Sequence, residues 1–267
     1  MQAASLLYHD VVPEGELDTS GFSGVVANRY KLTRTVFENH LQAIGSRSSI
    51  RCATAQQVLS GEMSHVCPCL MTFDDGGITA LTEIAPRLES LHWRGHFFIT
   101  TDCIGRPGFL SAEQVRELHQ RGHVIGTHSC SHPLRIDELN EVELLREWSE
   151  SAAVLEDILG TPIWCGSVPG GFFSRRVAIA ARQAGLKLLF TSEPTCRWTP
   201  FGDLRIAGRL PIVNHTTASH AATLAEGDRW TIFRQQCVWN GKKFAKSIAG
   251  EFYRDASEWF FRKKQLA

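Results

Sequence analysis

Two adjacent aspartates, Asp74 and Asp75, follow a short apolar run and precede two glycines. Because successive side chains at a strand end point in different directions, one carboxylate can bind a metal ion while the other acts as a base. Gly76 and Gly77 leave room for close approach of the backbone. An alternative interpretation is that the aspartates cap the helix that follows, where aspartate is favoured.

Two histidines, His128 and His132, are four residues apart after another predicted strand. Two imidazoles and one carboxylate are a common ligand set for a divalent ion, and they leave positions open for water and substrate. Either histidine alone is better explained by a hydrogen bond to a loop carbonyl. Their occurrence together with Asp74 and Asp75, each group after a strand, favours a metal site.

The elements that must position these side chains are short β-rich runs alternating with helical patterns. This alternation indicates a parallel sheet with crossover helices. In a parallel α/β barrel the strand ends converge on one face, so the loops that follow them are candidates for one site. The expected strands are 5–8, 69–73, 96–100, 123–127, 163–165, 187–191 and 209–213. The expected helices are 35–44, 79–91, 112–121, 140–159, 175–184 and a terminal helix at 247–264.

Two of the expected helices carry clear end signals. Ser111, with Gln114 three residues later, forms a capping-box pattern before helix 112–121. Helix 140–159 is followed by Gly160, which is typical of a helix end. Its expected apolar stripe consists of Val142, Leu145, Trp148, Ala152, Leu155 and Leu159.

Composition narrows the class of protein. A length of 267 residues suits one α/β barrel, and the 28 basic and 28 acidic residues cancel. A neutral chain has no broad positive field, so nucleic acid is not expected as a partner. No apolar run reaches the roughly 18 residues of a membrane span, and no signal-peptide pattern is present, so we expect no membrane span and a cytoplasmic location. The eight dispersed cysteines favour free thiols, mostly buried as small apolar residues.

Three segments resemble the polysaccharide deacetylase family (NodB homology domain, carbohydrate esterase family 4). Thr72–Gly76 has the family's T-F-D-D-G motif, and Gly122–His132 is similar to its G-H-x-I-G-x-H-[ST]-x-x-H segment. Leu7–His9 resembles the Tyr-His that opens the domain in many bacterial members. The resemblance extends from about residue 5 to about residue 213 and rests on motifs in the family's order and spacing.

The resemblance implies a fold, a cofactor and a base. The fold is a distorted, incomplete (β/α)7-type barrel with fewer than eight strands, in a single catalytic domain over 1–267. Its core covers about 5–213, and a C-terminal helical extension covers about 214–267. One divalent metal is implied on Asp75, His128 and His132, usually Zn²⁺, with Co²⁺, Ni²⁺ and Mn²⁺ as alternatives. Asp74 is implied as the general base.

The chain departs from the family at its third motif. The usual Arg-x-Pro, whose arginine binds the base, is replaced by Ser167–Gly171. Within this loop Pro169 and Gly170 are expected to orient substrate. Arg209, on a later predicted strand, is hypothesised to supply the missing guanidinium; the alternative is a strand-edge charge.

The family's general-acid histidine also lacks a clean match. His215, just past the predicted strand 209–213, is the nearest candidate. His220 lies further along the chain. His9, at the end of the first predicted strand, is expected to face the site. For each histidine, an ordinary loop or capping role is the alternative.

The leading functional hypothesis is a metal-dependent hydrolase that deacetylates an N-acetylated sugar or polysaccharide. One alternative is a catalytically weakened sugar-binding homologue, which the missing arginine favours. Retention of both Asp74 and Asp75 argues against that alternative, because a binding protein needs no free base. Another alternative is hydrolysis of a different non-peptide C–N bond in a small substrate. The sequence does not indicate the oligomeric state.

Overall fold

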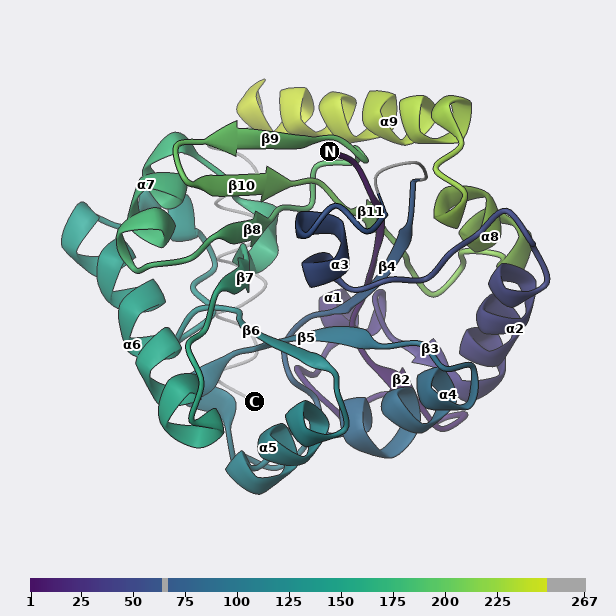
Figure 1. The fold of residues 1–267 in the computed structure, drawn as a ribbon, viewed down its shortest axis with the longest axis horizontal. Coiled ribbons are helices and arrows are strands. Elements are labelled where there is room, and N and C mark those ends of the chain that lie inside the picture. Colours follow the sequence, from purple (N-terminus) through teal and green to yellow (C-terminus); the bar gives the residue numbers. More distant parts are fainter. Residues whose placement is uncertain (64–66, 249–267) are drawn as a thin grey trace.

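A computed structural model describes residues 1–63 and 67–248 of the chain. Its main sheet curls into an incomplete barrel with helices on the outside (Figure 1). The strands of this sheet are β1 (Ala4–Tyr8), β4 (Cys69–Phe73), β5 (Gly95–Ile99), β6 (Val124–Thr127), β7 (Cys165–Ser167), β8 (Leu188–Phe190), β9 (Trp198–Phe201), β10 (Leu204–Ala207) and β11 (Leu210–Pro211). A small parallel pair, β2 (Val11–Val12) and β3 (Leu32–Thr33), lies apart from it.

Within the described residues, the main sheet has nine strands in the order β11-β1-β4-β5-β6-β7-β8-β10-β9. All neighbours are parallel except β9 and β10, which form an antiparallel pair at one edge. The expectation of an α/β fold built as an incomplete barrel is confirmed. The sheet exceeds the expected count of fewer than eight strands, because the short β11 pairs with β1 and the β9–β10 hairpin extends the far edge.

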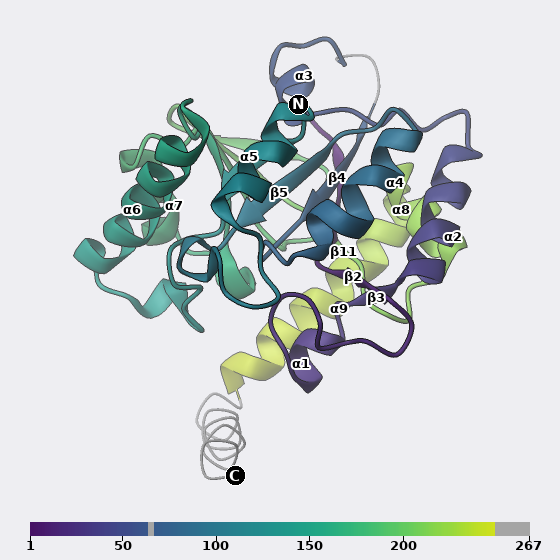
Figure 2. The same cartoon turned by 90° about the horizontal axis from the view of Figure 1, so that it is seen from below.

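The helices cover the outer face of the sheet. Figure 2 shows α2 (Arg34–Gly45) and α4 (Ala85–Ser90) on one side, and α6 (Glu141–Leu159) and α7 (Arg175–Gln183) on the other. The remaining helices are α1 (Val25–Asn28), α3 (Ala55–Leu59), α5 (Ala112–Gln120), α8 (Ala218–Ala225) and α9 (Arg229–Ile248), with short turns η1 (Ala80–Ile84), η2 (Thr101–Cys103), η3 (Ile136–Glu138) and η4 (Pro169–Gly171). Every residue of β1, β4 and β5 is buried, so the side chains on both faces of these strands are covered.

Local end signals were predicted correctly, whereas one buried helix face was not. Ser111 and Gln114 form the expected capping box, and Gly160 ends α6 in a left-handed conformation. The expected stripe on α6 was wrong at its N-terminal end, where Val142 is 79% exposed and Leu145 is 36% exposed. Leu144 is buried in their place, since it lies on the same helix face as Trp148.

The expected helix 79–91 is interrupted. Residues 80–84 form a wide π turn, and α4 begins only at Ala85. Pro86, in the first turn of α4, has no N–H to continue a regular hydrogen-bond ladder from the preceding turn. The prediction of a helix here was therefore correct, but its first half is a π turn rather than an α-helix.

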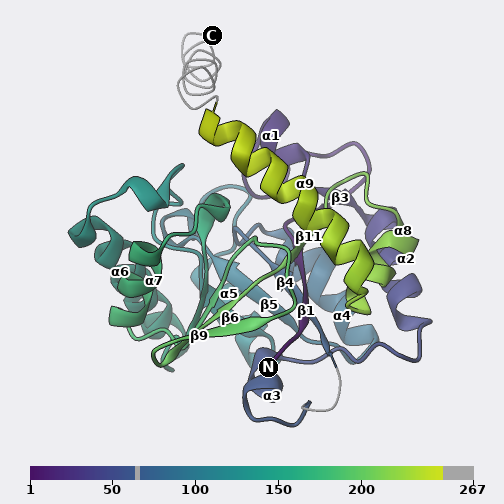
Figure 3. The same cartoon turned by 90° about the horizontal axis from the view of Figure 1, so that it is seen from above.

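The chain beyond residue 214, expected to be a helical extension, contains two helices, α8 and α9, whose bounds the sequence pattern did not predict. Figure 3 shows α9 crossing the β11 side of the sheet, where Gln235 donates a hydrogen bond to the Pro211 carbonyl (3.1 Å). The expected helix 247–264 lies almost entirely outside the described residues. No described helix has the length and apolarity needed to span a bilayer. The expected cytoplasmic location stays a prediction.

Candidate metal and acid–base site

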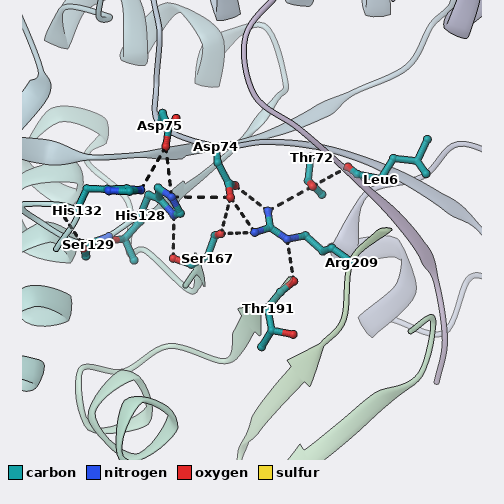
Figure 4. Close-up of polar contacts among 11 residues, drawn as sticks. Leu6, Thr72, Asp74, Asp75, His128, Ser129, His132, Ser167, Thr191 and Arg209 are labelled. Carbon is teal, nitrogen blue, oxygen red and sulfur yellow. Dashed lines mark hydrogen bonds and ion pairs between the residues drawn. The ribbon is translucent and has the colours of Figure 1, made fainter. Parts of the chain in front are cut away.

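Three side chains from two strand ends meet at one point (Figure 4). Asp75 follows β4, and His128 and His132 follow β6, on the other side of β5. One ligand atom from each residue lies within 4.8 Å of the others. Asp75 Oδ1 is 3.5 Å from His128 Nε2 and 3.6 Å from His132 Nε2. The structure therefore brings together the three residues expected to bind a metal.

The backbone around this cluster is held in unusual conformations. Asp75, Ser129 and His132 have positive φ angles of 76°, 64° and 53°, and among the described non-glycine residues only His92 shares this feature. Such conformations are unfavourable for side-chain-bearing residues and concentrate at functional sites. Gly77 permits a close approach, since a Cβ there would lie 2.0 Å from an oxygen of Asp10.

The donor set fits a divalent cation. Asp75 Oδ1 is buried and has no hydrogen-bond partner, although buried polar atoms are normally paired. His128 Nδ1 donates to the Ser167 carbonyl (2.9 Å), which leaves the lone pair of Nε2 directed at the two aspartates. A backbone carbonyl that fixes the tautomer in this way is typical of metal-ligating histidines. The described residues thus contain a possible Asp/His metal site.

The ionisation of Asp75 and His132 is compatible with metal binding. Burial would raise the pKa of Asp75, but the imidazoles of His128, His9 and His132 outweigh burial and hold that pKa well below its usual range. Burial, together with His128, lowers the pKa of His132 and favours the neutral imidazole. Metal ligation requires both forms, an ionised carboxylate and a neutral imidazole.

Asp74 lies beside this cluster, with Oδ2 3.8 Å from His128 Nε2, and forms a buried ion pair with Arg209. Arg209 Nη1 lies 2.7 Å from Asp74 Oδ1, and Nη2 lies 2.8 Å from Oδ2. Ser167 Oγ donates to Asp74 Oδ2 (3.1 Å) and accepts from Arg209 Nη2 (2.6 Å), while Arg209 Nε donates to the Thr191 carbonyl (3.1 Å). A fork-to-fork pair of this kind fixes the orientation of the carboxylate as well as its charge.

The guanidinium keeps Asp74 ionised despite burial. Burial alone would raise the pKa of Asp74, but Arg209 and His128 lower it below its ordinary value. The hypothesis that Arg209 lies beside Asp74 thus agrees with the geometry. Sequence reasoning missed Ser167 and Thr191 as partners; Ser167 at least heads the loop that replaces the family's third motif, whereas nothing in the pattern around Thr191 pointed to this site.

The two candidate acids differ in their surroundings. His215 is exposed, and the contact found for its imidazole is with its neighbour Asn214 (3.2 Å) rather than with the cluster. His9 follows β1 at the level where Asp74 follows β4, since Tyr8 pairs with Phe73, and its imidazole lowers the pKa values of both Asp74 and Asp75. His9 Nδ1 is buried without a hydrogen-bond partner. The geometry therefore favours His9 over His215 as a group that acts at this site.

Pro169 and Gly170 lie in η4, directly after β7, so they share the strand-end face with Ser167. Gly170 has a φ of 60° and turns the chain there. Their predicted role in orienting substrate stays a prediction.

A carboxylate on α6 holds the histidine loop in place. Glu147 accepts hydrogen bonds from the backbone N–H groups of Cys130 (2.9 Å) and Ser131 (3.0 Å) and from the Ser131 hydroxyl (2.7 Å). Since this loop contains left-handed residues, it needs such external support. Sequence reasoning missed Glu147, because its position on a helix gave no sign that it faces the loop.

Glu147→Ala is expected to weaken divalent-metal affinity by about 10- to 100-fold, because His132 loses its positioning. Competition with a chromophoric chelator measures the affinity. Glu150→Ala, an exposed change one turn further along α6, is the control and should leave the affinity unchanged. Equal metal affinities for the Glu147 variant and the wild type would show that the loop keeps its conformation without Glu147.

Comparison with known proteins was consistent with this geometry. The family model for polysaccharide deacetylase matches residues 67–189, a segment that contains both aspartates, both histidines and Ser167. YxkH of Bacillus subtilis (strain 168), whose description is "Putative polysaccharide deacetylase", is 24% identical over 170 residues, which are 62% of this chain and 61% of YxkH. Chitin deacetylase 2 of Saccharomyces cerevisiae is 29% identical over 131 residues, which are 48% of this chain and 38% of that protein. The chain thus spans less than two thirds of these relatives.

Solved structures show the same fold. The Streptococcus pyogenes deacetylase PplD, in complex with acetate, superposes with a TM-score of 0.70 at 18% identity, over 85% of this chain and 98% of that one. At this identity the likeness concerns architecture. The resemblance seen in the motifs is confirmed by the family model for polysaccharide deacetylase, which matches residues 67–189.

Proposed function

We propose that this chain is a metal-dependent hydrolase that removes the acetyl group from an N-acetylated sugar or polysaccharide. Residues 1–267 would act as one catalytic unit, with a core at about 5–213 and an extension at about 214–267. The observation that carries the proposal is the buried, ionised Asp74, oriented by Arg209 beside the ligand cluster. Asp74 Oδ2 lies 3.8 Å from His128 Nε2.

Asp75, His128 and His132 would hold one divalent ion, Zn²⁺ first, with Co²⁺, Ni²⁺ or Mn²⁺ as alternatives. When bound, such an ion polarises the acetamide carbonyl and lowers the pKa of water. His128 is kept in the ligating tautomer by the Ser167 carbonyl.

Asp74 would accept a proton from the attacking water. A general base must be ionised and within reach of that proton, and Arg209 secures the first condition by lowering the pKa of Asp74. Arg209 and Ser167 hold both carboxylate oxygens, so the side chain cannot rotate away from the reacting centre. A protein that only binds sugars has no use for this arrangement, which supports catalysis over the sugar-binding alternative.

The amine leaving group needs a proton, and we assign this role to His9. In support, His9 follows β1 at the level where Asp74 follows β4, and its unpartnered Nδ1 can exchange a proton with substrate or water. Tyr30 packs against the His9 ring with a centroid distance of 4.8 Å and restricts its rotation. His215, the candidate that the sequence favoured, becomes the second candidate for the general acid.

His9→Ala is expected to lower kcat by about 10²-fold or more, the usual effect of removing a positioned acid, with metal content unchanged. His215→Ala should leave kcat within about twofold, because an exposed side chain outside the cluster contributes little to the chemical step. Steady-state kinetics of acetate release distinguish the two. The reverse order of effects would return the acid role to His215.

The purified protein is expected to contain about one divalent ion per chain after growth in zinc-supplemented medium, since the site offers three ligands and open positions. Elemental analysis measures this content. His128→Ala and His132→Ala should each abolish it, whereas His220→Ala, an exposed histidine on α8, should not. A wild-type protein without metal under these conditions would falsify the ligand assignment.

The substrate class can be tested in one comparison. Acetate release is measured from chitooligomers, peptidoglycan fragments and small acetamido sugars with the metal-loaded enzyme. Turnover of any of these supports the proposal. Release of ammonia or another amine from a non-acetylated small amide, with no acetate from the sugars, would favour hydrolysis of another C–N bond.

A further inference from the structure

Four of the cysteines gather at the end of the barrel opposite the metal cluster. Cys69 is the first residue of β4, and its backbone forms an isolated β-bridge with that of Cys52. Cys67 and Cys196 lie beside them. The five residues of β4 separate this end from Asp74 by about 17 Å at the usual rise per residue. Among the described residues the cysteines do not form a three-ligand metal group. Their chemistry is therefore that of thiols rather than of a thiolate metal site.

Cys67 and Cys196 form the accessible pair in this group. The two residues are far apart in the chain, but their thiols are close enough for each to shift the pKa of the other. A Cβ on Gly227 would lie 3.1 Å from the Cys67 sulfur and 3.8 Å from the Cys196 sulfur, so both sulfurs lie under this glycine. Both residues are half-buried and line the same cavity of about 1000 Å³.

The surroundings of the pair favour thiol exchange. The neighbouring Cys196 thiol lowers the pKa of Cys67, which favours Cys67 as the attacking thiolate. Arg197 and Arg229 line the same cavity, where their positive charges favour an anionic reagent.

The backbone holds the two cysteine segments in position. Ala3 N–H donates to the Cys196 carbonyl (2.9 Å), and Ala4 N–H donates to the Pro68 carbonyl (2.8 Å). The start of β1 thus ties both segments to one place. Such a fixed pair converts the second exchange step into an intramolecular reaction.

We propose that Cys67 and Cys196 are a modification site that takes up a disulfide from a low-molecular-weight anionic disulfide. The Cys67 thiolate attacks one sulfur of the reagent, forms a mixed disulfide and releases the first reagent thiolate. Cys196, on losing its proton to that thiolate, attacks the Cys67 sulfur and releases the second. The two protein thiols are oxidised to one disulfide and the reagent disulfide is reduced to two thiols.

Other cysteines lack this combination. Cys103, Cys130 and Cys165 are buried, and Cys237 is exposed on α9. Burial raises the pKa of Cys165 far above its usual range and that of Cys130 to about 11, so both stay as inert thiols at neutral pH. Cys237 is the matched control, because it is accessible but has no place in the cysteine group.

The test uses the reduced full-length protein and glutathione disulfide as the probe. After exposure, free thiols are alkylated under denaturing conditions and counted by intact mass, and peptide mapping identifies the linked pair. We expect two fewer alkyl groups than in the reduced chain, a linked Cys67–Cys196 peptide and full reversal by dithiothreitol. Cys237→Ser should react as the wild type does, and Cys67→Ser and Cys196→Ala should each lose the cross-link completely.

The wild-type map decides the outcome even if a variant folds poorly. A full count of alkyl groups after exposure, a glutathione adduct confined to Cys237, or a disulfide between other cysteines would each overturn the proposal. None of these measurements depends on acetate release, so the result is independent of the proposed deacetylase activity.

Discussion

Asp74→Asn is expected to lower kcat/KM for acetate release by about 10³-fold while the metal content stays at the wild-type level. The amide keeps the shape of the side chain but cannot accept the water proton, and a positioned base contributes about 10²- to 10⁴-fold to the rate. The amide oxygen of the variant would still accept one hydrogen bond from Arg209, so the fold should persist. Steady-state kinetics and elemental analysis on the same preparation measure both quantities.

The matched control for this variant is Asp203→Asn. Asp203 lies in the exposed turn between β9 and β10, where it pairs with Lys187 (2.7 Å). The same chemical change there should leave kcat/KM within about twofold. An active Asp74→Asn enzyme would remove Asp74 as the base. Loss of metal together with activity would instead assign Asp74 to the ligand set.

Arg209→Ala is expected to lower the free energy of unfolding by about 3–5 kcal/mol, because it leaves the Asp74 carboxylate buried without its partner. Arg209 is fully buried, so water cannot replace its guanidinium without rearrangement. The Ser167 hydroxyl and the Thr191 carbonyl lose their partner in the same step. Urea denaturation at neutral pH measures the change.

Two further variants distinguish the effect of losing this ion pair from the effect of removing a charge in general. Arg209→Lys keeps the charge but lacks the planar fork, so it should recover only part of the stability and little of the activity. Arg146→Ala removes the arginine of an exposed pair with Glu150 and should change stability by less than about 0.5 kcal/mol. A similarly small loss for Arg209→Ala would mean that Asp74 is not held as the geometry indicates.

The Asp-Asp pair and the two histidines could be assigned from the sequence, for a topological reason. They follow β4 and β6, which flank β5, and parallel strands joined by crossover helices bring their carboxyl ends to one face. Spacing along the chain therefore maps directly onto proximity in space. The alternation of strands and helices up to about residue 213 was predictable for the same reason, since each element carries its own hydrophobic pattern.

The C-terminal helices were not predictable in this way. The buried face of α8 consists of Ala221, Ala222, Leu224 and Ala225. Alanine contributes little contrast between apolar and polar faces, so the periodicity is weak even though the residues are buried. Packing of α8 against α2, rather than a strong amphipathic pattern, determines its place.

What the sequence determined by itself is the candidate metal-ligand set and its place after two strand ends, because local order and sheet topology coincide there. Only the tertiary structure decided how Asp74 is held and which candidate histidine lies at its level of the sheet. Arg209 reaches Asp74 across 135 residues because β11 pairs with β1, which in turn pairs with β4, and pairing between segments so far apart leaves no local pattern in the chain. The choice between His9 and His215 depends on side-chain direction at a strand end, which the packing around each imidazole determines.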